Sequence, residues 1–124
     1  MRSKKPDTFE AWVGGYVGPS YKLELRDDTI TYEVFEQGYE LHSTEEIHPD
    51  SSQWGQFLND VSSSGIWEWN PRYKGADSAD GTTWYVNITA GPHSVTSRGL
   101  NHYPPGFVDF MRAVRRLLNG RQFS

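Results

Sequence analysis

Alternating apolar and polar residues in the second half of the chain place the strongest limit on what it can fold into. The segment 82–90 alternates with a period of two, and Gly91-Pro92 predicts a turn from it into a partner strand over 93–98. The apolar residues of 107–118 instead recur at spacings of three and four, which is typical of an amphipathic helix. A hairpin followed by such a helix indicates an α+β domain.

The first half of the chain shows the same alternation on both sides of a short polar turn. The segments 21–26 and 30–35 flank Asp27-Asp28, so we expect a hairpin with one buried face. A strand over 9–13 precedes this hairpin, and a short strand over 40–43 follows it. The buried face of the hairpin needs a second layer to cover it.

A first helix is expected to begin after Pro49. Asp50 at the N-cap and Gln53 three residues later predict a capping box, in which each side chain satisfies a free backbone donor. Between Trp54 and Val61 the apolar residues recur at spacings of three and four, and Gly65 suits a left-handed C-cap. The apolar stripe of this helix is a suitable cover for the hairpin.

The segment 66–69 is predicted to be a further strand, in which Trp67 and Trp69 share a face. The polar residues 74–80 are expected to form a loop. Together these elements predict a two-layer α+β fold: an antiparallel sheet of five to six strands with two helices packed on one face.

Length and composition limit the number of domains and the kinds of site that the chain can form. The chain has 124 residues, so we expect one α+β domain over 9–118, with a disordered tail over 1–8 and a frayed C-terminus over 119–124. The absence of cysteine excludes disulfides, thiolate zinc sites and a cysteine nucleophile. Because no apolar run approaches the roughly 18 residues of a membrane-spanning helix, we expect a cytoplasmic protein with no membrane partner.

Charge is distributed unevenly along the chain, whose formal net charge is −4. Residues 6–60 hold twelve acidic and two basic residues, whereas residues 61–124 hold four acidic and seven basic ones. This asymmetry disfavours nucleic-acid binding by the first half and favours a basic protein partner, although a solvated acidic rim is the alternative. The residues expected to contact that partner are Glu33, Glu36, Glu40, Glu45 and Glu46.

Aromatic residues make up 15% of the chain, a high share beside a total of 35% hydrophobic residues. Aromatic side chains suit both a core and a recognition surface. The functional interpretation is a stacking platform for a sugar ring or a base, formed by Trp67, Trp69, Tyr73 and Tyr103. The structural alternative is packing in the core, since a small domain needs bulky residues to reach adequate burial.

Candidate catalytic and metal-binding groups are few. His42 and His48 lie among acidic residues that could join them around a divalent metal, but their spacing matches no zinc motif. The chain has no G-x-S-x-G elbow. The segment 77–81 lacks the closing glutamate of a calcium loop, and we interpret Asp80-Gly81 as a turn. We therefore expect no catalytic residue, no metal, no cofactor and no enzymatic activity.

Three motifs give the chain a resemblance to other proteins. P-S-Y-K-L-E-L and I-T-Y lie within 19–32, D-G-T-T-W covers 80–84, and S-R-G-L-N-H-Y-P-P-G-F covers 97–107. In these motifs the chain resembles small uncharacterised bacterial single-domain proteins. The resemblance implies a compact α+β domain in a bacterial or phage setting, and it transfers no catalytic residue.

Three functional hypotheses follow from these observations. The leading one is a non-enzymatic protein-interaction domain, such as an immunity or inhibitor-like factor, that binds a basic partner. The second is a small-ligand or carbohydrate binder that uses the aromatic platform. The third is a hydrolase that uses His42 or His48 with nearby carboxylates. The oligomeric state stays open at this point.

Overall fold

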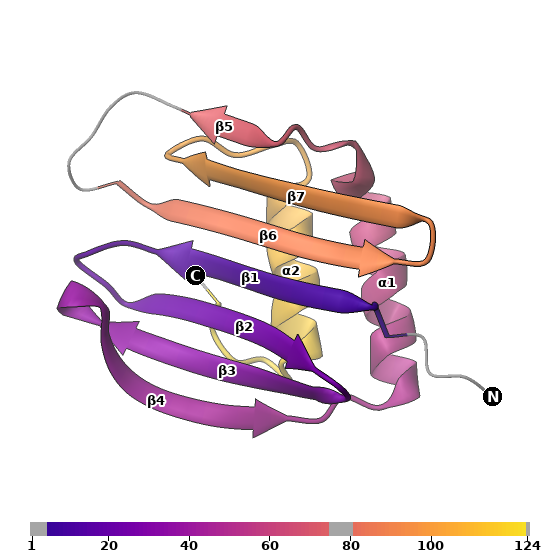
Figure 1. The fold of residues 1–124 in the computed structure, drawn as a ribbon, viewed down its shortest axis with the longest axis horizontal. Coiled ribbons are helices and arrows are strands. Elements are labelled where there is room, and N and C mark those ends of the chain that lie inside the picture. Colours follow the sequence, from indigo (N-terminus) through magenta and orange to yellow (C-terminus); the bar gives the residue numbers. More distant parts are fainter. Residues whose placement is uncertain (1–4, 75–80, 124) are drawn as a thin grey trace.

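The computed structural model describes residues 5–74 and 81–123. These residues form one mixed sheet of strand order β4-β3-β2-β1-β6-β7-β5, and both helices lie against its same face (Figure 1). The strands are β1 (Thr8–Gly14), β2 (Ser20–Arg26), β3 (Thr29–Glu36), β4 (Glu40–Ile47), β5 (Arg72–Lys74), β6 (Thr83–Ala90) and β7 (His93–Leu100). The helices are α1 (Ser51–Ser64), α2 (Phe107–Leu117) and two short 3-10 helices, η1 (Gln37–Tyr39) and η2 (Ile66–Glu68). The face under α1 and α2 is named the closed face, and the other is named the open face.

The structure confirms the α+β class, but the sheet differs from the expected one. The prediction of five to six antiparallel strands is wrong, because the sheet is 7-stranded and β5 runs parallel to β7. With three residues, β5 is too short to show a period-two pattern. Strand β4 continues to Ile47 rather than ending near residue 43, and it shows little alternation because every residue before Ile47 is exposed at the sheet edge. The loop expected over 74–80 lies outside the described residues beyond Lys74.

The segment 66–69 is not the predicted strand. The left-handed Gly65 ends α1, and the chain tightens at once into η2. The rings of Trp67 and Trp69 therefore do not share a face: Trp67 stacks on His93, whereas Trp69 is buried in the core. A four-residue segment with three apolar side chains does not distinguish a strand from a tight helical turn, which explains the error.

The first helix begins and ends as predicted. The Asp50 carboxylate accepts a hydrogen bond from the Gln53 backbone N–H at 2.8 Å, and the Gln53 side chain accepts one from the Asp50 N–H at 3.0 Å. Both helices bury their apolar stripes against the closed face in one hydrophobic core. Its largest fully buried side chains include Trp54, Trp84, Phe9, Phe57 and Phe110. In the described part of the chain, no helix is both long and apolar enough to cross a membrane.

Residues 5–7, directly before β1, are tied to the rest of the domain, although 1–8 is expected to be a disordered tail. The Asp7 backbone N–H donates to the Thr89 carbonyl oxygen at 2.7 Å, which continues the pairing of β1 with β6. Lys5 forms an ion pair with Asp28 at 3.4 Å. The described part of this segment is therefore held by backbone pairing at residues 7–8 and by the Lys5 ion pair, which a sequence pattern does not reveal.

The C-terminal segment also packs more closely than the frayed end expected over 119–124. Asn119 and Gly120 both have positive φ, and they turn the chain back beneath the sheet after α2. Phe123 is consequently 0% exposed, and its ring lies 6.2 Å from that of Tyr21, centroid to centroid. A single apolar residue beyond the helix closes the core at this position. Because this residue is isolated in the sequence, no periodic pattern predicts its burial.

Candidate functional site

The connections between strands gather at two opposite ends of the sheet (Figure 1). The end on the left of Figure 1 holds residues 14–20 and the helix η1. It also holds residues 81–82, which precede β6, and the segment 100–107, which runs from the last residue of β7 into α2. It is named the loop end. The opposite end holds the tight turns Asp27-Asp28 and Gly91-Pro92, and it is named the turn end.

Large apolar side chains are exposed at the loop end. In the described ranges, the exposed large hydrophobic residues are Tyr16, Val17, Tyr39, Leu41, Tyr103 and Val108. Each lies in a loop-end connection or within two residues of one. Single exposed apolar residues are common on protein surfaces, but a contiguous group of them marks an interaction site. The loop end is therefore the candidate functional site.

Four of these side chains surround a cavity of about 620 Å³, named the loop cavity. It is lined by residues 13–19, Tyr21, residues 81–82, residues 103–104 and residues 106–109. Its walls come from the β1–β2 connection on one side and from the entry to α2 on the other. The lining is mainly apolar, and Asp109 is its one charged side chain among the described residues.

Glycines bring these walls close together. A Cβ atom on Gly15 would lie 2.7 Å from the Gly81 carbonyl oxygen, and a Cβ on Gly18 would lie 2.9 Å from the carbonyl carbon of Glu36. Gly106 precedes α2 with φ of 84°, a conformation that favours glycine. The backbone therefore needs glycine here to form the cavity and to bring the β3–β4 connection beside it.

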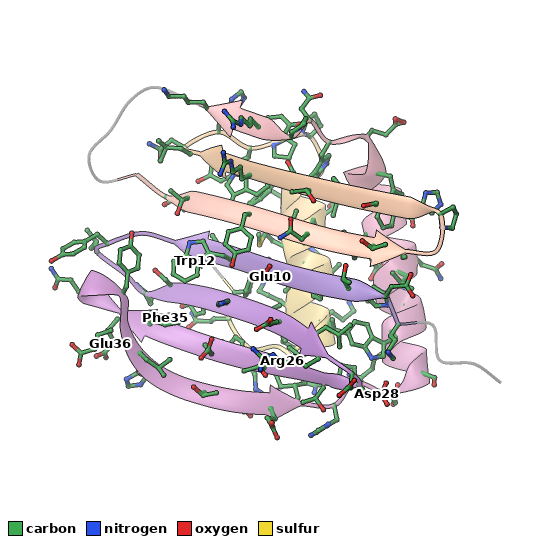
Figure 2. The ribbon with its side chains drawn as sticks, in the orientation of Figure 1. Glu10, Trp12, Arg26, Asp28, Phe35 and Glu36 are labelled. Atoms are coloured by element: carbon green, nitrogen blue, oxygen red, sulfur yellow. The ribbon has the colours of Figure 1, made fainter. Side chains whose placement is uncertain are left out.

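An aromatic cluster adjoins the loop cavity on the open face. The Trp12 ring lies 5.5 Å from Phe35 and 5.9 Å from Tyr39, and Tyr39 lies 6.1 Å from Tyr16, all between ring centroids. Figure 2 shows Trp12 and Phe35 near the loop end. This cluster was not predicted from the sequence. Its signal was present, since Trp12 and Phe35 occupy positions that the alternation assigns to the polar face.

The five acidic residues predicted to bind a partner divide into two groups. Glu36 and Glu40 are register partners on β3 and β4, on either side of η1, so they flank the exposed Tyr39. Glu36 is 3.2 Å from His42 and, like it, is exposed. These two acids belong to the loop end.

Glu33, Glu45 and Glu46 lie away from the β3–β4 connection, farther along the same two strands. Glu33 is half-buried on the open face opposite Lys22, and Glu46 is exposed. Glu45 accepts hydrogen bonds from Arg121, one of them at 3.0 Å, and these hold the pKa of its carboxyl below the ordinary value. Glu45 and Glu46 pair with Tyr32 and Thr31 toward the turn end, so this group lies outside the loop end.

The four residues of the predicted stacking platform do not come together on one surface. Trp69 is 8% exposed and donates its indole N–H to the Pro105 carbonyl oxygen at 3.1 Å. Tyr73 is half-buried, with its ring 6.0 Å from that of Trp84. Trp67 lies on the other side of η2, against His93. Tyr103 alone of the four lines the loop cavity.

The centre of the open face is polar. Glu10 accepts hydrogen bonds from the Tyr85 hydroxyl at 3.3 Å and from the Asn87 side-chain amide at 3.2 Å. Burial and then the adjacent Glu10 carboxylate raise the pKa of Tyr85 to about 12. Figure 2 shows Glu10 beside Trp12 on β1, so this polar network borders the aromatic cluster.

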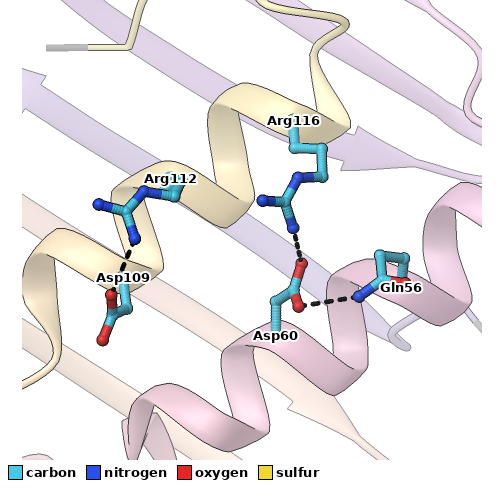
Figure 3. A network of polar contacts seen from close by, with 5 residues as sticks. All are labelled: Gln56, Asp60, Asp109, Arg112 and Arg116. Atoms are coloured by element: carbon cyan, nitrogen blue, oxygen red, sulfur yellow. Dashed lines mark hydrogen bonds and ion pairs between the residues drawn. The ribbon is translucent and has the colours of Figure 1, made fainter.

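The outer surface of the two helices carries a network of paired charges (Figure 3). Arg116 contacts Asp60 at 2.8 Å across the helices, and Gln56 donates to the same carboxylate at 2.9 Å. Arg112 pairs with Asp109 at 3.3 Å within α2. This surface joins α1 to α2, and only Asp109 reaches the loop cavity.

The histidines lie apart from one another. His42 pairs with Glu36, and His48 Nδ1 lies 3.3 Å from the Thr29 hydroxyl. His102 packs edge-on against Tyr73. Over residues 5–74 and 81–123, no group of three histidine or acidic residues is placed to hold a metal ion. The segment 77–81, whose Asp80-Gly81 is interpreted as a turn, lies outside the described residues except for its last glycine.

The sequence was compared with known proteins. In these comparisons, no protein-family model matches the chain and no curated protein matches it.

Proposed function

We propose that this chain is a non-enzymatic protein-interaction domain, of the immunity or inhibitor type, and that the loop end binds a basic partner protein. The observation that carries the proposal is the gathering of the exposed large apolar residues beside Glu36 and Glu40. Protein interfaces combine apolar and aromatic residues at the centre with a polar rim. The loop end has both components side by side.

The apolar and acidic parts have different roles in this proposal. Aromatic and aliphatic anchors that become fully desolvated supply most of the binding energy of an interface. Rim charges mainly accelerate the encounter with a partner of opposite charge, and salt screens their effect. We therefore expect an association rate that falls with ionic strength and a dissociation rate that depends on the apolar residues.

The test uses the chain as bait in a lysate of its native cell, at low and at high salt. A basic protein should be recovered at low salt, and the Glu36→Gln/Glu40→Gln variant should associate with it more slowly. The matched control is Asp27→Asn/Asp28→Asn, which removes the same charge at the turn end and should leave the rate near that of the unaltered chain. Equal association rates for the two variants, or no salt-sensitive basic protein at all, would contradict the proposal.

A small-ligand binder is the second candidate function. The observation in its favour is the volume of the loop cavity, about 620 Å³, which falls within the usual range of ligand pockets. A panel of glycans and nucleotides, titrated while tryptophan fluorescence is recorded, tests it. A spectrum that stays unchanged throughout the panel removes this candidate.

A further inference from the structure

The loop cavity has the chemistry of a site for an aromatic side chain. Tyr16, Tyr103 and Phe107 line it together with Val17 and Val108. Apart from the tyrosine hydroxyls, its lining contains two polar side chains, those of Thr82 and Asp109. A sugar needs a matched donor or acceptor for each buried hydroxyl, whereas a large aromatic ring needs mainly apolar area and a second ring to pack on.

The charges around the cavity favour positively charged residues next to that aromatic side chain. Asp109 lines the cavity on the α2 side. Glu36 and Glu40 do not line it, but the Glu36 backbone lies against Gly18 on the other side, and Glu40 is the register partner of Glu36. No basic residue lines the cavity in the described part of the chain. Arg112 pairs with Asp109, and His42 pairs with Glu36, but exposed pairs of this kind are weak. The rim therefore favours a cation.

A second copy of this chain is disfavoured as the occupant. Its own loop end would bring the same three carboxylates toward Glu36, Glu40 and Asp109, and like charges placed together oppose binding. A partner with lysine or arginine next to an apolar anchor has the complementary pattern instead.

We infer that the loop cavity receives one aromatic side chain of the basic partner, and that lysine or arginine residues next to that side chain contact the carboxylates of Glu36, Glu40 and Asp109. This inference rests on the proposed function, and it specifies the chemistry of the segment that the loop end recognises. Val17 and Val108 contact the aromatic side chain, and the three acidic residues contact the basic residues on either side of it.

Three short peptides test the inference: acetylated and amidated Lys-Trp-Lys, Glu-Trp-Glu and Lys-Ala-Lys. Binding is followed through the backbone amide signals of Gly15, Gly18 and Gly106 in ¹H–¹⁵N spectra. Lys-Trp-Lys should shift these signals, and Lys-Ala-Lys should leave them unchanged. Glu-Trp-Glu should bind about three-fold to ten-fold more weakly than Lys-Trp-Lys, a range that corresponds to a few exposed charge contacts.

Two matched variants locate the site. Val108→Arg places a cation at the cavity rim and should weaken Lys-Trp-Lys binding at least ten-fold. Ser94→Arg adds the same charge at an exposed position near the turn end that does not line the cavity, and it should keep the affinity within about two-fold. Both positions are exposed, and unchanged amide signals elsewhere in the spectrum show that each variant remains folded.

The outcomes separate this inference from the proposed function. Shifts that spare the three glycine signals, equal binding of Lys-Ala-Lys, or an unchanged affinity in Val108→Arg would each overturn the inference. If a basic partner still associates in a manner that depends on Glu36 and Glu40, the proposed function stands without it. If the peptides behave as expected but no basic partner exists in the cell, the proposed function fails and the cavity chemistry stands.

Discussion

The two ends of the sheet differ in how their exposed residues are used. At the turn end, the chain satisfies its own polar groups: Asp28 pairs with Lys5, and the Asp7 carboxylate accepts a hydrogen bond from the Gly91 N–H at 3.0 Å. At the loop end, large apolar side chains such as Tyr16 and Val108 remain exposed. The turn end therefore uses polar groups for contacts within the chain, whereas the loop end has large apolar side chains exposed.

The difference follows from the length and composition of the connections. Tight turns such as Asp27-Asp28 leave no room for an apolar side chain that is not needed by the core. The longer connections at 14–20 and 100–107 carry aromatic and aliphatic residues together with glycines. These glycines let the backbones approach and leave the side chains around a cavity instead of inside the core. Loops on a rigid scaffold are where binding residues concentrate.

The largest expected effect is the difference in stability loss between alanine variants of Trp69 and Trp67, whose rings lie on different sides of η2. Trp69→Ala should lower the free energy of unfolding by about 3–5 kcal/mol, because a buried ring that packs on Phe107 and Phe110 leaves a cavity. Trp67→Ala should cost only about 1–2 kcal/mol, since this half-buried ring loses a stack on His93. Urea denaturation of both variants measures the difference. Equal losses would mean that η2 does not separate the two rings.

The next effect compares a glycine from each end. Gly106 and Gly91 both have positive φ, so alanine should cost about 1–2 kcal/mol at either position. At Gly106 the new Cβ would also overlap the Ser64 carbonyl oxygen, and such overpacking adds about 1–3 kcal/mol. At Gly91 the Cβ would have open space. The melting temperature should therefore fall further for Gly106→Ala, and the reverse order would contradict the close approach of α1 to the loop end.

A third prediction is that exposed apolar side chains at the loop end determine dye binding but contribute little to the free energy of unfolding. The double variant Tyr16→Ser/Val108→Ser should keep the free energy of unfolding within about 0.5 kcal/mol, because both side chains are exposed. It should also lose most of the fluorescence of Nile red bound to the native protein, since the dye needs exposed apolar surface. The control Asp27→Ser/Asp28→Ser, at the turn end, should retain the dye signal. A dye signal that persists in the first variant would place the apolar surface elsewhere.

The smallest effect concerns Glu45, which lies on β4 toward the turn end. The pKa of Glu45 is lower in the folded state than its ordinary value of 4.5, chiefly because Arg121 donates hydrogen bonds to its carboxylate. The stabilisation from this pair is therefore complete above pH 4.5 and is lost as the pH falls through the lower folded-state pKa. Glu45→Gln should be less stable than the unaltered chain near neutral pH, and the difference should shrink in acid.

A double-mutant cycle with Arg121→Gln is the check on this last prediction. In the Arg121→Gln background, Glu45→Gln should have no pH-dependent effect on the free energy of unfolding, because the charged partner is gone. A pH-dependent difference that survives in this background would assign the acid sensitivity to other carboxylates.

Some parts of the candidate site could be predicted from the sequence, and others could not. The acidic residues Glu36 and Glu40 stand out by charge alone. The aromatic cluster was detectable in principle, since Trp12 and Phe35 break the polar side of an alternating pattern. The loop cavity was not, because its walls come from connections about 60 to 90 residues apart, and no local pattern says that they meet.

Local signals in the sequence specify three parts of the fold: the alternating hairpin strands, the capping box of Asp50 and Gln53, and the helix that closes the domain. The parallel pairing of β5, the burial of Phe123 and the meeting of Tyr16 with Tyr103 around one cavity depend on tertiary contacts instead. This division arises because periodicity records only which face of an element is buried. Long-range pairing and glycine-dependent close approach decide which elements become neighbours.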